Sequence, residues 1–173
     1  MPRMQRVRLP AEQRRQDILN HAAHLFADQG FEAVSMGTIA QAIGTSRPNV
    51  YTYFPDLVSV LRVLLDRRLS DLEAELTPQL GPGASLNLSA LWDTLGQHRQ
   101  TLLLLHCAGE PVLRAERERF DVLVSGLLRD VPEERRVLMS SLVRGLVYDT
   151  LVQGQPAEHA LTELAILLRP AAD

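Results

Sequence analysis

Hydrogen-bond donors suited to DNA base edges and phosphate oxygens are concentrated in one short stretch of the chain. They are Arg47, Asn49, Tyr51, Thr52 and Tyr53. Val50 and Phe54 lie among them four residues apart, a spacing that places both on one face of a helix. A short helix with an apolar inner face and a polar outer face is suited to insertion into the major groove of DNA.

A second expected helix precedes this segment. Ser35 is a good N-cap, and an apolar face follows it at helical spacing, formed by Met36, Ile39, Ala40 and Ile43. Gly44 ends that helix, because the residue after a last turn often needs a left-handed conformation. Thr45 and Ser46 can cap the next helix, and Pro48 in its first turn costs no backbone hydrogen bond. The spacing indicates a helix-turn-helix; an ordinary hairpin inside a larger helical bundle is the alternative.

Residues 14–61 resemble the DNA-binding domain of the tetracycline-repressor (TetR) family. The matching positions are Ile18, Leu19, Ala22, Ala23, Leu25, Phe26, Gly30, Phe31, Ser35, Ile39, Ala40, Gly44, Ser46, Tyr51, Tyr53, Phe54 and Pro55. The resemblance implies an all-α protein with an N-terminal helix-turn-helix domain and a C-terminal helical domain for ligand binding and dimerisation. It implies DNA contacts from Ser35, Thr45, Ser46, Arg47, Pro48, Asn49, Tyr51, Thr52 and Tyr53.

Two positions depart from the family pattern. Pro48 stands where glycine is common, and a first-turn position tolerates this exchange. Leu57 stands where a phosphate-contacting lysine is usual, which weakens the expected grip on DNA.

Composition and charge agree with a DNA-binding helical protein. The 173 residues are 46% hydrophobic and only 5% aromatic, which favours one or two compact domains of the all-α class. All 18 basic residues are arginines. Residues 1–68 contain nine arginines and six acidic residues, a net charge of +3, whereas the rest of the chain has a net charge of −6. Phosphate neutralisation dominates DNA affinity, so the basic part is the expected DNA face. Arg3, Arg6 and Arg8 could reach a minor groove, although a solvated tail is the preferred interpretation.

Breaks in the helical pattern suggest three segments. Helices are expected from about Pro10 to Gln29 and from about Pro55 to Leu76, and the Pro- and Gly-rich residues 77–83 form a boundary. We therefore expect a DNA-binding domain over 1–57, a connecting helix and linker over 58–83, and a regulatory and dimerisation domain over 84–173. The last segment suggests four helices, over about 86–108, 110–130, 130–154 and 156–168.

The C-terminal half also suggests two interaction surfaces. Its last two helices carry more apolar surface than one protomer needs to bury, so we expect a homodimer through Leu138, Leu142, Leu146, Leu161, Leu164 and Leu168. Both faces could instead be internal core.

A mainly apolar ligand pocket is a second hypothesis, lined by Trp92, Arg99, Leu103, His106, Cys107, Phe120 and Tyr148. The family resemblance implies a small inducer for such a pocket, but plain core is an equal interpretation, and this half is shorter than is usual for the family.

Other chemistries find little support. No Cys or His spacing matches a zinc site, and Ser140 and Ser141 lack the surroundings of a catalytic nucleophile. The single cysteine, the lack of an apolar signal core and the lack of a membrane-spanning stretch suggest a soluble, cytoplasmic protein. We expect a cofactor-free, metal-free and non-enzymatic transcriptional regulator that binds a pseudo-palindromic operator in double-stranded DNA, most simply a repressor released by a small apolar ligand. Alternatives are a ligand-independent or protein-regulated regulator of the same fold and, remotely, a small hydrolase or metal protein.

Overall fold

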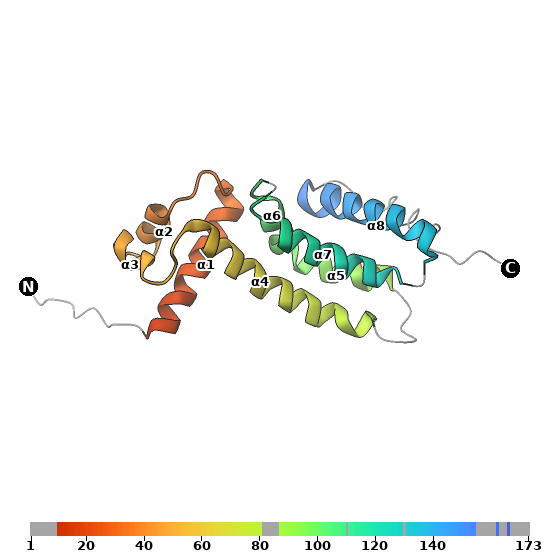
Figure 1. Ribbon diagram of the computed structural model, residues 1–173, viewed down its shortest axis with the longest axis horizontal. Coiled ribbons are helices and arrows are strands. Elements are labelled where there is room, and N and C mark those ends of the chain that lie inside the picture. Colours follow the sequence, from red (N-terminus) through yellow and green to blue (C-terminus); the bar gives the residue numbers. More distant parts are fainter. Residues whose placement is uncertain are drawn as a thin grey trace, which may run out of the picture. The chain divides into compact units, whose positions relative to one another are not determined.

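The computed structural model describes residues 10–80, 87–109, 111–129 and 131–154, together with Thr162 and Ile166 (Figure 1). Every regular element within these residues is helical, which confirms the predicted all-α class. The α-helices are α1 (Ala11–Gln29), α2 (Met36–Ala42), α3 (Arg47–Tyr51), α4 (Leu57–Leu76), α5 (Leu88–Gln97), α6 (Arg99–His106), α7 (Arg114–Leu127) and α8 (Glu133–Val147). Two shorter helical turns are η1 (Thr77–Leu80) and η2 (Tyr148–Val152). Leu161, Leu164 and Leu168, with most of the expected last helix, lie outside the described residues.

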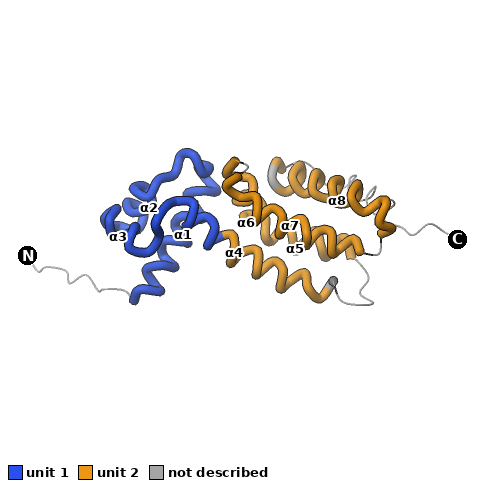
Figure 2. Tube along the Cα trace, viewed as in Figure 1, with its two compact units in different colours: residues 1–64 blue, residues 65–173 orange. Residues whose placement is uncertain are grey.

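Contacts divide the chain into two compact units, residues 1–64 and 65–173 (Figure 2). The division falls inside α4, so this one continuous helix contributes residues to both units. The N-terminal part of α4 buries Val60, Leu61 and Leu64, and its C-terminal part buries Leu65, Leu69, Leu72 and Leu76. This explains why its leucine stripe is broader than a three-helix domain needs. The three-segment division drawn from the sequence stays a prediction.

Local capping shapes the turn of the N-terminal unit. Ser35 and Thr38 form a capping box at the start of α2: the Ser35 hydroxyl accepts from the Thr38 amide at 3.1 Å, and the Ser35 amide donates to the Thr38 hydroxyl at 2.7 Å. Gly44 follows α2 with φ of 65°, the left-handed conformation that the sequence predicted there. Ser46 holds the N-cap position of α3 by its extended backbone, with no capping bond from its side chain.

The C-terminal unit contains a break that the sequence did not predict. The helix expected over 86–108 is wrong, because it divides at His98 into α5 and α6. His98 has φ of −90° and ψ of 15°, and its imidazole Nε2 lies 3.1 Å from Glu75 Oε1 on α4. A contact between residues so distant in sequence leaves no periodic signal, and Gly96 weakens the helix just before the break.

The remaining helices begin and end close to the expected positions. Helix α7 begins at Arg114 rather than at 110–111, and α8 begins after Pro132. The helical run after α8 continues through η2 before Gly154, whose φ is 76°. Helices α7 and α8 lie side by side (Figure 1), and their contact includes an ion pair of 3.2 Å between Asp121 and Arg144.

Candidate nucleic-acid interface

Helix α3 is held by its inner face and presents a polar outer face. Val50 and Phe54, predicted to point inward, are 0% and 2% exposed. The five residues of α3 cannot form a stable isolated helix, so this burial is what holds the segment in place. Ser46, Arg47, Pro48, Tyr51 and Thr52 are exposed, as is Ser35 at the start of α2, whereas Thr45, Asn49 and Tyr53 are half-buried.

Arg47 and Tyr51 form a pair on the exposed side of α3. The Arg47 guanidinium donates to the Tyr51 hydroxyl at 3.0 Å, and its central carbon lies 5.5 Å from the centroid of the Tyr51 ring. The two residues are four apart and therefore neighbours on the helix surface. A cation held against an aromatic ring has fewer rotamers to lose on binding, so the pair is pre-organised for contact with an anion.

Other polar residues of the motif have partners inside it. The Asn49 amide donates to the Thr45 hydroxyl at 2.8 Å, which connects the turn to α3. The Thr52 hydroxyl donates to the carbonyl of Pro48 at 3.2 Å. These bonds orient the turn and the end of α3, whereas the side chains of Arg47 and Tyr51 are exposed and bond to each other.

Arg15 on α1 also fixes the end of α3, and the sequence analysis missed it. Its guanidinium donates to the carbonyl of Tyr53 at 3.1 Å and lies 4.4 Å from the ring centroid of Phe54. Tyr53 lies two residues beyond α3, so this bond connects the turn that follows α3 to α1. The position of Arg15 three residues before buried Ile18 was an available signal, since that spacing places it on the inner side of α1.

Helix α4 begins at Leu57, the position that departs from the family pattern. The Asp56 carboxylate accepts from the Ser59 amide at 2.7 Å and caps the helix, and this bond lowers the pKa of Asp56. The Leu57 side chain is half-buried in the first turn. An exposed helix start with a partly accessible side chain leaves room for a longer residue.

We expect Leu57→Lys to strengthen DNA binding. Each added phosphate contact steepens the slope of log affinity against log salt by about 0.9, so a dimer gains about twice that. Operator affinity measured at several salt concentrations tests this, with Leu57→Met as the uncharged control of similar length. An unchanged slope in folded Leu57→Lys would show that the start of α4 lies away from the phosphates.

Comparison with known proteins agrees with this geometry. Residues 18–57 match the family model described as bacterial regulatory proteins, tetR family. The matched residues run from the middle of α1 through α2 and α3 to the first residue of α4. The DNA-binding segment of the chain is therefore that of the TetR family.

Curated transcriptional regulators match a little over half of the chain. The HTH-type transcriptional regulator AcrR of Shigella flexneri is 33% identical over 103 residues, which are 54% of this chain and 47% of AcrR. The HTH-type transcriptional regulator EthR of Mycobacterium tuberculosis is 30% identical over 108 residues, 57% of this chain and 50% of EthR. The chain thus spans about half the length of these curated relatives.

Solved structures extend the likeness in fold to most of the chain. A TetR-like transcriptional regulator from a Rhodococcus species has a TM-score of 0.70 and 24% identity, covering 93% of this chain and 96% of that one. The multidrug binding protein EbrR, complexed with imidazole, has a TM-score of 0.69 and 20% identity, covering 92% of this chain and 97% of EbrR. At these identities the likeness establishes the TetR fold.

The C-terminal unit of the chain contains a cavity of about 690 Å³. It is lined by Leu105, His106, Arg114, Arg117, Glu118, Phe120, Asp121, Ser141, Arg144, Gly145, Val147 and Tyr148. The volume suits a drug-sized molecule. On one side the rings of His106 and Tyr148 lie with their centroids 4.9 Å apart.

The cavity brings together three of the seven predicted pocket residues. His106, Phe120 and Tyr148 line it, whereas Trp92, Arg99, Leu103 and Cys107 do not. Five charged side chains from α7 and α8 also line it, although the sequence suggested mainly apolar surroundings. The pocket assignment stays a prediction.

Cys107, the neighbour of His106 in the chain, is half-buried. Burial raises the pKa of its thiol to about 11, so the nucleophilic thiolate is scarce at neutral pH. No group of three His, Cys, Asp or Glu side chains placed to hold a metal ion occurs within the described parts of the chain. In the same residues no helix has the length and apolar content to cross a bilayer.

The predicted dimerisation residues that the structure describes lie on the outer side of α8. Leu138 and Leu142 are 62% and 44% exposed, and Leu146 is half-buried. Met139, Val143 and Val147 are buried on the opposite side of the same helix. Helix α8 therefore has one apolar stripe inside the unit and a second one outside it.

Proposed function

We propose that the chain is a sequence-specific DNA-binding transcriptional regulator that acts as a homodimer in the cytoplasm rather than as an enzyme. The observation that carries the proposal is the exposed Arg47–Tyr51 pair on α3, a helix positioned by buried Val50 and Phe54. A guanidinium and a phenol at this place can hydrogen-bond to guanine edges and to phosphates. The match of residues 18–57 to the TetR family supports the same interpretation.

Dimerisation is proposed from the outer stripe of α8. One short recognition helix reads few base pairs, and a two-fold symmetric pair reads an inverted repeat. Exposed Leu138 and Leu142 offer an apolar surface that a second copy can cover. We place the DNA contacts at Ser35, Thr45, Ser46, Arg47, Pro48, Asn49, Tyr51, Thr52 and Tyr53.

Release by a small ligand is the proposed mode of regulation. The cavity beside α7 has a suitable volume, and its lining combines apolar Leu105, Phe120 and Val147 with charged side chains. An amphiphilic molecule fits this lining better than a purely apolar one, because its polar groups can hydrogen-bond to the charged side chains while its apolar part packs against Leu105, Phe120 and Val147. Among the similar proteins, EbrR is called multidrug binding and NalD a repressor of a multidrug efflux pump.

Selection from a random pool of DNA duplexes tests the proposed function. We expect the wild-type protein to enrich one inverted repeat whose half-sites lie about 10 base pairs, or a multiple of this, from centre to centre. Binding of that duplex should fall steeply with salt, as phosphate contacts require. Binding that ignores sequence, or a pool that shows no enrichment, would contradict sequence-specific recognition.

A further inference from the structure

Arg15 on α1 makes two contacts with the residues that follow α3. Its Nη1 donates to the carbonyl of Tyr53 at 3.1 Å, and its central guanidinium carbon lies 4.4 Å from the centroid of the Phe54 ring. Phe54 is 2% exposed, so the guanidinium lies against a ring in the core of the N-terminal unit. One arginine thus contacts both the backbone and a side chain just beyond α3.

The end of the helix-turn-helix depends on contacts with other helices. The amides of Tyr53 and Phe54 both donate to the carbonyl of Val50, at 3.0 and 3.1 Å, so these bonds reach only as far as α3. Helix α3 has five residues, too few to be stable by itself. The contacts of Arg15 connect this end to α1, a helix of 19 residues.

The residues that Arg15 contacts adjoin the predicted DNA contacts. Tyr51 and Thr52 are exposed at the end of α3, and Tyr53 is half-buried beside them. Hydrogen bonds to base edges require donors placed within about 0.5 Å. A rotation of this end would displace the Tyr51 hydroxyl and, with it, the guanidinium of Arg47 that donates to it. The orientation of the reading face therefore depends on what holds residues 53 and 54.

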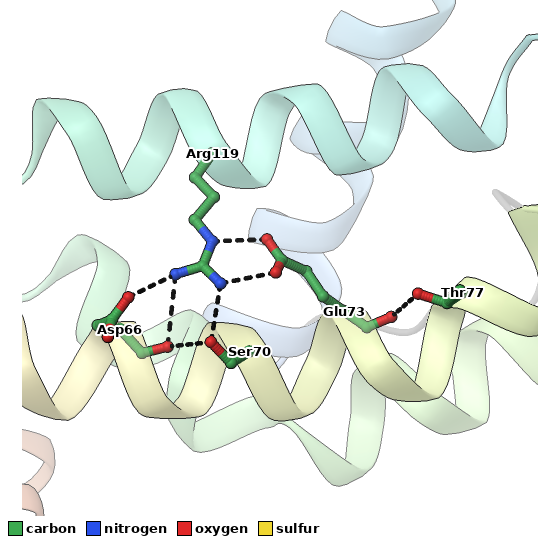
Figure 3. Close-up of polar contacts among 5 residues, drawn as sticks. All are labelled: Asp66, Ser70, Glu73, Thr77 and Arg119. Carbon is green, nitrogen blue, oxygen red and sulfur yellow. Dashed lines mark hydrogen bonds and ion pairs between the residues drawn. The ribbon is translucent and has the colours of Figure 1, made fainter.

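The partners of Arg15 differ from those of an arginine that joins helices by ion pairs. Arg119 on α7 donates to carboxylate oxygens of Glu73 at 2.6 Å and Asp66 at 2.8 Å, and to the Ser70 hydroxyl at 2.9 Å (Figure 3). Among the residues that the structure describes, no carboxylate forms an ion pair with Arg15. Arg15 therefore keeps its positive charge beside the motif, and this charge also attracts DNA phosphates at long range.

From these contacts we propose that Arg15 is a positioning residue for sequence-specific DNA binding, which orients the end of α3 through Tyr53 and Phe54. The inference rests on the proposed function and deepens it, because it names a residue of α1 on which base readout by α3 depends. It requires that the loss of Arg15 weaken binding of the selected duplex more than binding of unrelated DNA.

The first test compares Arg15→Gln with Arg14→Gln on the duplex that the wild-type protein selects. Arg14 is the matched control, because it precedes Arg15 on α1 and pairs with Asp17 of the same helix at 3.8 Å. Both variants lose one charge at adjacent positions, so long-range attraction to phosphates falls about equally. We expect Arg15→Gln to bind about 5- to 30-fold more weakly than Arg14→Gln, as loss of a base contact would. Equal affinity of the two variants overturns the proposal.

A duplex of scrambled sequence distinguishes positioning from a phosphate contact made by Arg15 itself. A phosphate contact contributes to binding of every sequence, so its loss weakens binding of both duplexes by the same factor. Positioning acts on base contacts, which only the selected duplex makes. We expect Arg15→Gln and Arg14→Gln to bind the scrambled duplex equally well. A loss by Arg15→Gln that is as large on the scrambled duplex as on the selected one overturns the proposal.

Thermal unfolding and Arg15→Lys separate positioning from stability. A residue that only stabilises the fold lowers the melting temperature and leaves the affinity of the folded protein unchanged, which contradicts positioning. Lysine keeps the charge and can donate to the Tyr53 carbonyl, but it lacks the planar guanidinium that lies on the Phe54 ring. We expect Arg15→Lys to bind the selected duplex with an affinity between those of wild type and Arg15→Gln. Should Arg15→Gln fail to fold, Arg15→Lys decides: a several-fold loss confined to the selected duplex supports the proposal, and wild-type affinity overturns it.

A double-mutant cycle tests whether Arg15 acts through α3. At low salt, where weak binding is measurable, Arg15→Gln should cost at least about 3-fold less affinity in Tyr51→Ala than in wild type, because the base contact that it misplaces is already absent. The same cost in both backgrounds rules out action through α3. Wild-type protein that selects no duplex contradicts the proposed function itself, whereas Arg15→Gln that binds as Arg14→Gln does contradicts only the role of Arg15.

Discussion

Arg47→Ala and Tyr51→Ala are each expected to remove most of the affinity for the selected duplex while leaving a folded dimer. Both side chains lie on the exposed side of α3 and contribute nothing to the buried face formed by Val50 and Phe54. Loss of a base contact costs about 1–3 kcal/mol, and a symmetric dimer loses the contact in both half-sites. Fluorescence anisotropy with the labelled duplex measures the loss, and circular dichroism confirms the fold.

Two further variants separate the parts of this pair. Tyr51→Phe removes the hydroxyl that accepts from Arg47 and keeps the ring, so a partial loss is expected if the hydrogen bond pre-organises the guanidinium. Arg99→Ala removes an exposed arginine at the start of α6 and should bind as wild type does. If Arg47→Ala and Tyr51→Ala also bind normally, α3 is not the helix that enters the groove.

Leu142→Arg is expected to convert the dimer into monomers or insoluble chains. Leu142 is exposed on the outer stripe of α8 in the single chain, and in the proposed dimer it packs against the symmetry mate. An unpaired charge buried in such an interface costs about 3–5 kcal/mol, and the two-fold axis introduces it twice. Sedimentation velocity at micromolar concentration measures the change.

The dimer also determines how this variant binds DNA. A monomer reads one half-site, so Leu142→Arg should lose affinity for the full inverted repeat although its α3 is intact. Gln97→Arg introduces the same charge at an exposed position of α5 and should remain a dimer. A wild-type monomer at micromolar concentration would rule out the dimer, and a dimeric Leu142→Arg would place the interface elsewhere.

Much of the N-terminal unit could be predicted because its signals are local. The Ser35 cap, the left-handed Gly44 and the inward Val50 and Phe54 each depend on neighbours within about one helical turn. These features can therefore be predicted from the order of residues along the chain. The same rules placed α1 within one residue of its observed start.

Features of the candidate sites that depend on distant residues could not be predicted in this way. Arg15 contacts Tyr53 across 38 positions, and Arg119 contacts Glu73 across 46. The break at His98 accompanies a contact of 3.1 Å between His98 Nε2 and Glu75 Oε1, and only three of the seven expected pocket residues line the cavity. Helical periodicity states which face of a helix is apolar, but it does not state which other helix that face meets.

The sequence by itself determined the helical class, the helix-turn-helix and the polar face of α3, since short-range spacing, capping and turn conformation specify them. Only the tertiary structure decided that α7 has the cavity on one side and Arg119 on the other, with α4 beneath it. The physical reason is that side-chain contacts between helices depend on the angle and register at which the helices pack. The same apolar periodicity is compatible with several packing angles and several registers.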